Sequence, residues 1–101
     1  MRVVVMLRPT NRRGTKSAYT AYRNQLLANG FTLVQPEVYI RAVPSRKVAS
    51  RCMRELCKGI PTTGSICAFC MTERQYERVT YLAGGRGAQE DLVGVRSMVD
   101  L

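Results

Sequence analysis

Two apolar runs in the middle of the chain lie only two residues apart. Residues 31–35 (FTLVQ) and 38–43 (VYIRAV) are rich in β-branched and aromatic side chains, and Pro36-Glu37 separates them. A link this short joins antiparallel neighbours or bends one ribbon sharply, because parallel strands need a crossover of about a dozen residues or more. The middle of the chain is therefore predicted to be antiparallel β-structure, around which the other elements must be arranged.

The elements on either side of these runs alternate between strand and helix. The β-branched run 2–7 (RVVVML) predicts a strand buried on both faces, and Ser45 predicts the N-cap of a later helix. The predicted elements outside the central pair are a strand at 2–7, a helix at 16–29, a helix at 45–58, a strand at 65–71, one helical turn at 72–77 and a strand at 78–83. The order βαββαβ, with two helices on one antiparallel sheet, predicts a ferredoxin-like α+β domain over residues 1–83.

A glycine-rich segment follows the predicted domain. Gly84-Gly85-Arg86-Gly87 is expected to be a hinge, and residues 92–99 (LVGVRSMV) a short last strand. A strand beyond such a hinge can pair with the sheet edge of another subunit, because edge strands present unpaired backbone groups. Residues 84–101 are therefore predicted to exchange between the two chains of a homodimer. The side chains expected to contact the partner are Leu92, Val93, Val95 and Met98.

The positive charge of the chain is concentrated toward its start. The net charge is +9, 12 of the 16 Lys and Arg residues lie within the first 60 positions, and no acidic residue precedes Glu37. This asymmetry indicates a polyanionic partner. Nucleic acid is favoured over a membrane, because no basic amphipathic helix is long enough to lie on lipid unaided. The longest apolar run, residues 3–7, is too short for a bilayer span or a signal peptide, so a cytoplasmic protein is expected.

Basic side chains form three groups that could contact phosphates. The loop after the first strand carries four cations (Arg8, Arg12, Arg13 and Lys16), and Gly14 allows close approach of the backbone. The second helix carries four more (Lys47, Arg51, Arg54 and Lys58) on one face, for which an ordinary solvated surface is the alternative interpretation. The predicted DNA-binding residues are Arg12, Arg13 and Lys16 in the loop, Arg51 and Arg54 on the helix, and Arg86 in the hinge.

Other classes of site are disfavoured. The four cysteines (Cys52, Cys57, Cys67 and Cys70) are predicted to be free, buried apolar residues rather than zinc ligands, because residues 67 and 70 point to opposite faces of a strand. The chain has no His, which removes the commonest general base. Glu37 and Glu73 could bind a metal, but single surface carboxylates are usually solvated, so no catalytic residue and no metal ligand is predicted. The aromatic residues Tyr19, Tyr22, Phe31 and Tyr39 are expected in the core, since the Gly-rich basic signature of an RNA-recognition sheet is absent from the sequence.

Two segments, NGFTLVQPEVYIRAVP at 29–44 and MTERQYERVTYLAG at 71–84, resemble the CRISPR-associated Cas2 family of adaptation proteins. The likeness covers residues 1 to about 85, and the tail that follows looks like the exchanged C-terminal strand of that family. The resemblance implies a ferredoxin-like homodimer that bridges two dimers of the Cas integrase. Such a dimer would hold the middle of a double-stranded protospacer DNA during its insertion into the CRISPR array.

Many members of that family are also described as metal-dependent endonucleases. The resemblance implies a metal site built on an aspartate just after strand one, in a Phe-Asp-aliphatic-Pro pattern, from each subunit. Here Leu7-Arg8 stand at that position, and an arginine cannot donate a carboxylate oxygen to Mg²⁺. A non-catalytic DNA-binding scaffold is therefore expected, with Mg²⁺ required only for any nuclease activity. The alternatives are an endoribonuclease of this family or of the VapD-like toxins, acting through Glu37 or another carboxylate, and a ribosome-associated or general RNA-binding protein.

Overall fold

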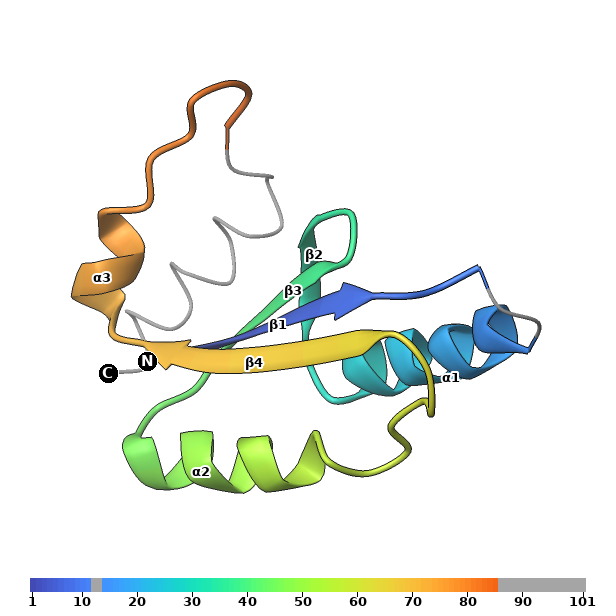
Figure 1. Cartoon of the computed structure of the whole chain (residues 1–101). Helices are drawn as coiled ribbons and strands as arrows, with labels where there is room; N and C mark the ends of the chain where they lie inside the picture. Colours follow the sequence, from blue (N-terminus) through green and yellow to red (C-terminus); the bar gives the residue numbers. More distant parts are fainter. Residues whose placement is uncertain (12–13, 86–101) are drawn as a thin grey trace.

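Four strands form one antiparallel sheet in the computed structural model, which describes residues 1–11 and 14–85 (Figure 1). The elements are β1 (Arg2–Arg8), α1 (Thr15–Ala28), β2 (Thr32–Gln35), β3 (Val38–Ala42), α2 (Arg46–Glu55), β4 (Ser65–Met71) and α3 (Glu73–Glu77). The strand order is β2-β3-β1-β4, and every neighbouring pair is antiparallel. The predicted α+β class and the βαββαβ order are confirmed.

The predicted hairpin is confirmed and is slightly irregular. Strands β2 and β3 pair from Thr32↔Ile40 to Gln35↔Val38, with a register shift between Leu33 and Gln35. Glu37, in the two-residue connection, has a φ of 67°, a left-handed conformation that non-glycine residues seldom adopt. Its backbone carbonyl accepts a hydrogen bond of 2.8 Å from the Leu7 amide. The turn is thereby tied to the end of β1.

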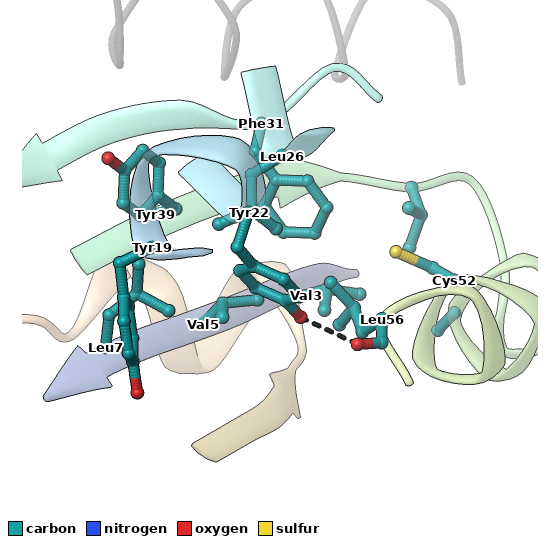
Figure 2. Close-up of a cluster of buried hydrophobic side chains, with 12 residues drawn as sticks. Val3, Val5, Leu7, Tyr19, Tyr22, Leu26, Phe31, Tyr39, Cys52 and Leu56 are labelled. Carbon is teal, nitrogen blue, oxygen red and sulfur yellow. Dashed lines mark hydrogen bonds between the residues drawn. The ribbon is translucent and has the colours of Figure 1, made fainter. Parts of the chain in front are cut away.

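Both long helices pack on the same face of the sheet and enclose the main core. Val3, Val5 and Leu7 alternate along β1 toward the helices, because successive strand residues point to opposite faces. Figure 2 shows these side chains against residues of both helices and of the neighbouring strand. The predicted core aromatics are confirmed; all are at most 5% exposed, namely Tyr19, Tyr22, Phe31 and Tyr39.

Helix ends are fixed by local sequence. Ser45 is the predicted N-cap of α2, and its hydroxyl oxygen accepts a hydrogen bond from the Val48 amide at 3.3 Å. The short helix α3 begins with a capping box, in which Thr72 and Gln75 satisfy each other's backbone amides. This box places Glu73 in the first helical turn, beside the start of β1. The predicted single helical turn is confirmed.

The buried hydroxyl of Tyr22 makes the folding stability depend on pH in the alkaline range. Its hydroxyl donates to the Leu56 carbonyl at 2.7 Å (Figure 2), and burial raises its pKa above the ordinary 10.0, an effect that the Cys57 and Cys52 thiols increase. The folded state holds the hydroxyl proton of Tyr22 more tightly than the unfolded state does. The stabilisation that this proton provides is therefore complete below the unfolded pKa of 10.0 and is lost as pH rises through the folded pKa.

We expect Tyr22→Phe to lower the free energy of unfolding by about 1 kcal/mol at neutral pH and to show a shallower fall of that free energy above pH 10. Urea denaturation across this range checks it, and equal alkaline slopes in both proteins would contradict it.

The opposite face of the sheet is apolar, and the described residues cover it only in part. Val4 and Ile40 point to this side and are buried with Tyr76 of α3. Met6 and Phe69 remain 38% and 41% exposed. A cavity of about 430 Å³ lies on this face, lined by sheet residues and by residues 79–83. Contiguous exposed apolar surface of this kind is typical of an interaction site.

The predicted strand at 78–83 is wrong. After α3 the backbone is irregular as far as residue 85. Residues 79–83 line the cavity on the sheet face instead of extending the sheet. The β-branched and aromatic side chains of this segment are typical of a strand, but here they belong to an irregular segment beside the sheet face.

The prediction of four buried cysteines is wrong for three of them. Cys52 is buried on α2, and burial raises the pKa of its thiol. Cys57, Cys67 and Cys70 are exposed. Cys57 lies just beyond the end of α2, while the other two lie on β4, which is an outer strand of the sheet and has exposed side chains on both faces. Among the residues that the structure describes, no helix combines the length and apolar character needed to cross a bilayer.

Candidate nucleic-acid interface

A polar cavity lies where β1 ends and β4 begins. Arg8, the last residue of β1, pairs with Ser65, the first residue of β4. The cavity is about 410 Å³ in volume and its lining residues are Arg8, Thr10, Thr63, Gly64 and Ser65. The lining thus offers one guanidinium and three hydroxyl groups, and its described residues include no carboxylate. Guanidinium and hydroxyl donors are the groups with which proteins contact phosphate oxygens.

Hydroxyl contacts join this cavity to the start of α1. The Thr15 and Thr63 hydroxyls lie 2.7 Å apart, and Thr10 lies 3.4 Å from Thr15. The Tyr19 hydroxyl donates to the Thr63 carbonyl at 2.8 Å. These contacts connect residues that are 44 and 48 positions apart in sequence. The turn before β4 is therefore held against the first turn of α1.

Gly64 is required for this close approach. Its φ is 79°, and a Cβ at this position would collide with the Tyr19 hydroxyl and the Arg8 carbonyl. A side chain would therefore push the turn away from both α1 and β1. Glycine at this position allows Thr63 and Ser65 to lie on either side of the backbone contact and to line the cavity.

The start of α1 adds a favourable environment for an anion. Its N-cap is Gly14, which is left-handed with a φ of 85° and offers no side-chain hydrogen bond to the helix. The first turn contains no acidic residue, and Lys16 is exposed there. The backbone amides at a helix N-terminus carry partial positive charge, so the first turn of α1 favours negatively charged groups. Lys16 is therefore accessible at this helix end, and its contact with a phosphate stays a prediction.

The other predicted binding residues divide into two sets. Lys47, Arg51 and Arg54 are exposed on α2, and Lys58 is exposed just beyond its end, because the helix stops at Glu55 rather than at the predicted residue 58. Lys58 pairs with Glu55 at 3.1 Å, and none of the four lines the cavity. A DNA contact by α2 stays a prediction. The second set lies outside the described residues, and its members are Arg12, Arg13, Arg86, Leu92, Val93, Val95 and Met98.

The carboxylates that were candidates for metal binding are held by arginines. Arg23 donates to both oxygens of Glu37, from Nε at 2.9 Å and from Nη2 at 2.7 Å. This hydrogen bonding raises the pKa of Arg23, and the pair links α1 to the β2–β3 turn. Glu73 accepts from Arg2 at 3.0 Å. Within residues 1–11 and 14–85, His, Cys, Asp and Glu side chains do not gather in any group of three or more that could hold a metal.

Comparison with known proteins gives a consistent set of relatives. The chain is 31% identical over 76 residues to the CRISPR-associated endoribonuclease Cas2 of Acidovorax ebreus, covering 75% of this chain and 74% of the relative. It is 31% identical over 87 residues to the protein of that name from Streptococcus mutans, covering 85% and 80%. With that of Paracidovorax avenae it shares 32% identity over 82 residues, or 81% and 76% of the two chains. No protein-family model matches the chain.

Proposed function

This chain belongs to the CRISPR-associated Cas2 family, and we propose that it is a structural, DNA-binding subunit of the complex that acquires CRISPR spacers. In this role a homodimer bridges dimers of the Cas integrase and holds double-stranded protospacer DNA without cutting it. The observation that carries the proposal is the end of β1. Leu7-Arg8 stand where a metal-binding aspartate is expected for this family, and Arg8 lines a cavity rich in hydroxyl groups.

The charge at this end favours a phosphate over a cation. Leu7 is buried and points into the core, so its neighbour Arg8 is the side chain exposed at the end of β1. A guanidinium repels Mg²⁺ and forms paired hydrogen bonds with phosphate oxygens. Lys16 and the predicted contacts Arg12 and Arg13 extend the positive region along the loop. Several such contacts give binding that is insensitive to base sequence and falls steeply with salt.

The sheet face opposite α1 and α2, which the described residues cover only in part, supports the homodimer. Its exposed apolar side chains include Met6, Phe69 and Leu82, the last being 97% exposed. A second copy that covers this face would remove that surface from water, which is the main favourable term in most protein association. Strands β2 and β4 are the outer strands of the sheet, so an edge is available for residues 92–99 of a second copy. A symmetric pair would also present two DNA-binding ends. Because this role acts on chromosomal DNA, the proposed location of the protein is the cytoplasm of a prokaryote.

Endoribonuclease activity is the second candidate, because the curated relatives bear that name. On this chain it would require carboxylates to bind a divalent metal. Glu37 would first have to leave its two hydrogen bonds with Arg23, and Glu73 its contact with Arg2. The geometry of both carboxylates therefore favours the scaffold over the nuclease.

A paired binding and cleavage assay separates the two functions. Labelled duplex DNA and single-stranded RNA are incubated with the protein in Mg²⁺, Mn²⁺ or EDTA, then run on native and denaturing gels. We expect duplex DNA to bind equally with and without metal, to dissociate as salt rises, and to stay intact. Metal-dependent cleavage that Glu37→Gln abolishes would establish the nuclease instead. Preference for single-stranded RNA without cleavage would indicate a general RNA-binding protein.

A further inference from the structure

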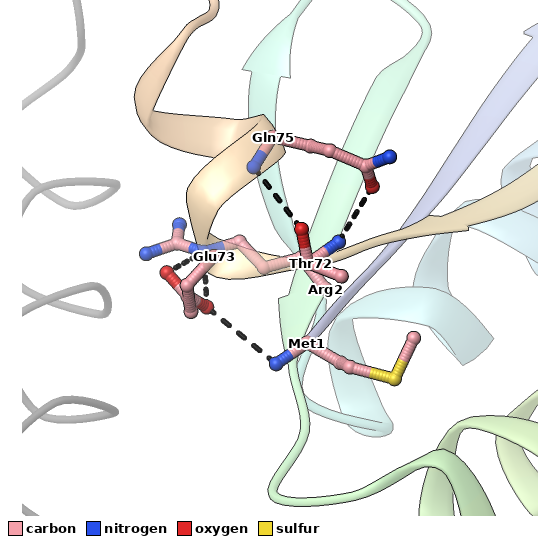
Figure 3. Close-up of polar contacts among 5 residues, drawn as sticks. All are labelled: Met1, Arg2, Thr72, Glu73 and Gln75. Carbon is pink, nitrogen blue, oxygen red and sulfur yellow. Dashed lines mark hydrogen bonds and ion pairs between the residues drawn. The ribbon is translucent and has the colours of Figure 1, made fainter.

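Arg2, the first residue of β1, carries a buried guanidinium at the end of the sheet opposite Arg8. The residue is 2% exposed. Its Nε donates to both oxygens of Glu73, at 3.0 and 3.3 Å (Figure 3). Its guanidinium carbon lies 3.5 Å from the centre of the Tyr76 ring. The side chain is thus fixed between α3 and the sheet by one ion pair and one aromatic ring.

One donor group of this guanidinium is unsatisfied. The Nη1 atom is buried and has no hydrogen-bond partner among residues 1–11 and 14–85. Buried polar groups in native proteins nearly always have a partner, and a charged donor is the most costly to leave without one. Glu73 also lies 3.8 Å from the amino group of Met1 (Figure 3), so two cations share one carboxylate. The Nη1 donor therefore lacks an acceptor, preferably an anionic one, among the described residues.

Most acidic residues in the described part of the chain already form ion pairs. Glu37 pairs with Arg23, Glu55 with Lys58 and Glu73 with Arg2 itself. Glu77 is exposed on α3. The remaining acids of the sequence are Glu90, Asp91 and Asp100, which flank the apolar run 92–99.

The position of Arg2 indicates which molecule supplies the acceptor. Tyr76, against which Arg2 stacks, lines the apolar cavity on the sheet face opposite α1 and α2. A second copy that covers this face would reach Arg2 at its border. We propose that Arg2 is the receptor for a carboxylate from residues 90–101 of a second copy of the chain. The inference rests on the proposed homodimer and adds to it a specific charged contact that fixes the register of the docked segment.

A double-mutant cycle on the full-length protein tests the contact. Arg2→Lys keeps a cation for Glu73 and for the Tyr76 ring but removes Nη1. Glu90→Gln with Asp91→Asn removes one pair of carboxylates, and Asp100→Asn removes the other candidate. Sedimentation velocity over a range of protein concentrations gives the dimer dissociation constant of each variant. Circular dichroism at the same concentrations confirms that each variant is folded.

We expect one acidic variant to raise the dissociation constant about tenfold or more, because truncating one partner of a buried charge pair is costly. Arg2→Lys should act similarly, and the combined variant should add little to either single effect. Glu77→Gln is the control. It removes one negative charge from α3, and its dimer dissociation constant is expected to equal that of the wild-type protein.

Two results would overturn the contact while leaving the dimer intact. In the first, the dimer forms, but neither acidic variant weakens it, or the effect of each simply adds to that of Arg2→Lys in the combined variant. In the second, the coupling appears in monomer unfolding and does not depend on concentration, which would assign the carboxylate to the same chain. A wild-type protein that stays monomeric at every concentration would overturn the homodimer itself, and this inference with it.

Discussion

Duplex DNA is expected to bind about 100-fold more weakly when four cations around the end of β1 are replaced by alanine. The four are Arg8, Arg12, Arg13 and Lys16. Each exposed charge contact is worth up to about 1 kcal/mol, so four contacts of about 0.7 kcal/mol each give this factor. The slope of log binding constant against log salt should also become shallower by about 0.9 for each phosphate that the variant no longer neutralises. A gel-shift or fluorescence-anisotropy series in increasing salt measures both quantities.

Pairwise variants locate the effect. Arg8→Ala with Lys16→Ala tests the described end of the fold, and Arg12→Ala with Arg13→Ala tests the loop between them. The matched control is Arg74→Ala with Arg78→Ala, which removes two exposed charges near α3, at the opposite end of β1. If the control pair weakens binding as much as the loop pairs do, the effect is one of net charge and the proposed site is wrong. A salt slope unchanged in both loop pairs would exclude phosphate contacts there.

Replacing Glu73 by alanine is expected to cost about 3 kcal/mol of folding free energy. Breaking a buried ion pair from one side leaves an uncompensated charge, which typically costs about 3–5 kcal/mol. Arg2 is 2% exposed but Glu73 is 22% exposed, so the lower end of that range applies. Urea denaturation at low protein concentration measures the loss without a contribution from association.

Glu77→Ala provides the control for this substitution. It removes the same side chain from the same helix, where Glu77 is exposed, and should change stability by no more than about 0.5 kcal/mol. A loss below about 1 kcal/mol in Glu73→Ala would show that water reaches Arg2 easily. That result would also weaken the case for a second carboxylate at Nη1.

Local sequence patterns predicted most of the fold. The two-residue link at Pro36-Glu37, the apolar spacing of α1 and the Ser45 cap each depend on neighbours a few positions away. The order of elements followed from them. The predicted strand at 78–83 failed because β-branched and aromatic side chains do not distinguish a strand that pairs with a sheet edge from an irregular segment beside a sheet face. The predicted burial of Cys67 and Cys70 was wrong, because the exposure of side chains on an outer strand depends on which other elements cover that strand.

The candidate site was less accessible to prediction from the sequence. Basic residues in the loop could be found by composition, and Lys16 is exposed in the first turn of α1. The contacts of Thr63 with Thr15 and Tyr19 join distant parts of the chain, and no local pattern marks them. The ion pair of Glu37 with Arg23 was not predicted, because the two residues lie 14 positions apart in the sequence. Arg2 stands at the start of a β-branched run, where nothing in the sequence distinguishes it from an exposed residue at the end of a strand.

Gly64 separates what can change at this end of the molecule from what cannot. The turn that it permits contacts Tyr19 and the backbone of Arg8, and thus involves the core and the sheet rather than the side chains that meet a ligand. Over evolutionary time, a residue exchanged at position 8 alters charge at the surface and leaves this framework untouched. The side chain at position 8 could therefore be exchanged without passing through an unfolded intermediate. Substitutions of Gly64 itself would be removed by selection first, through folding rather than through binding.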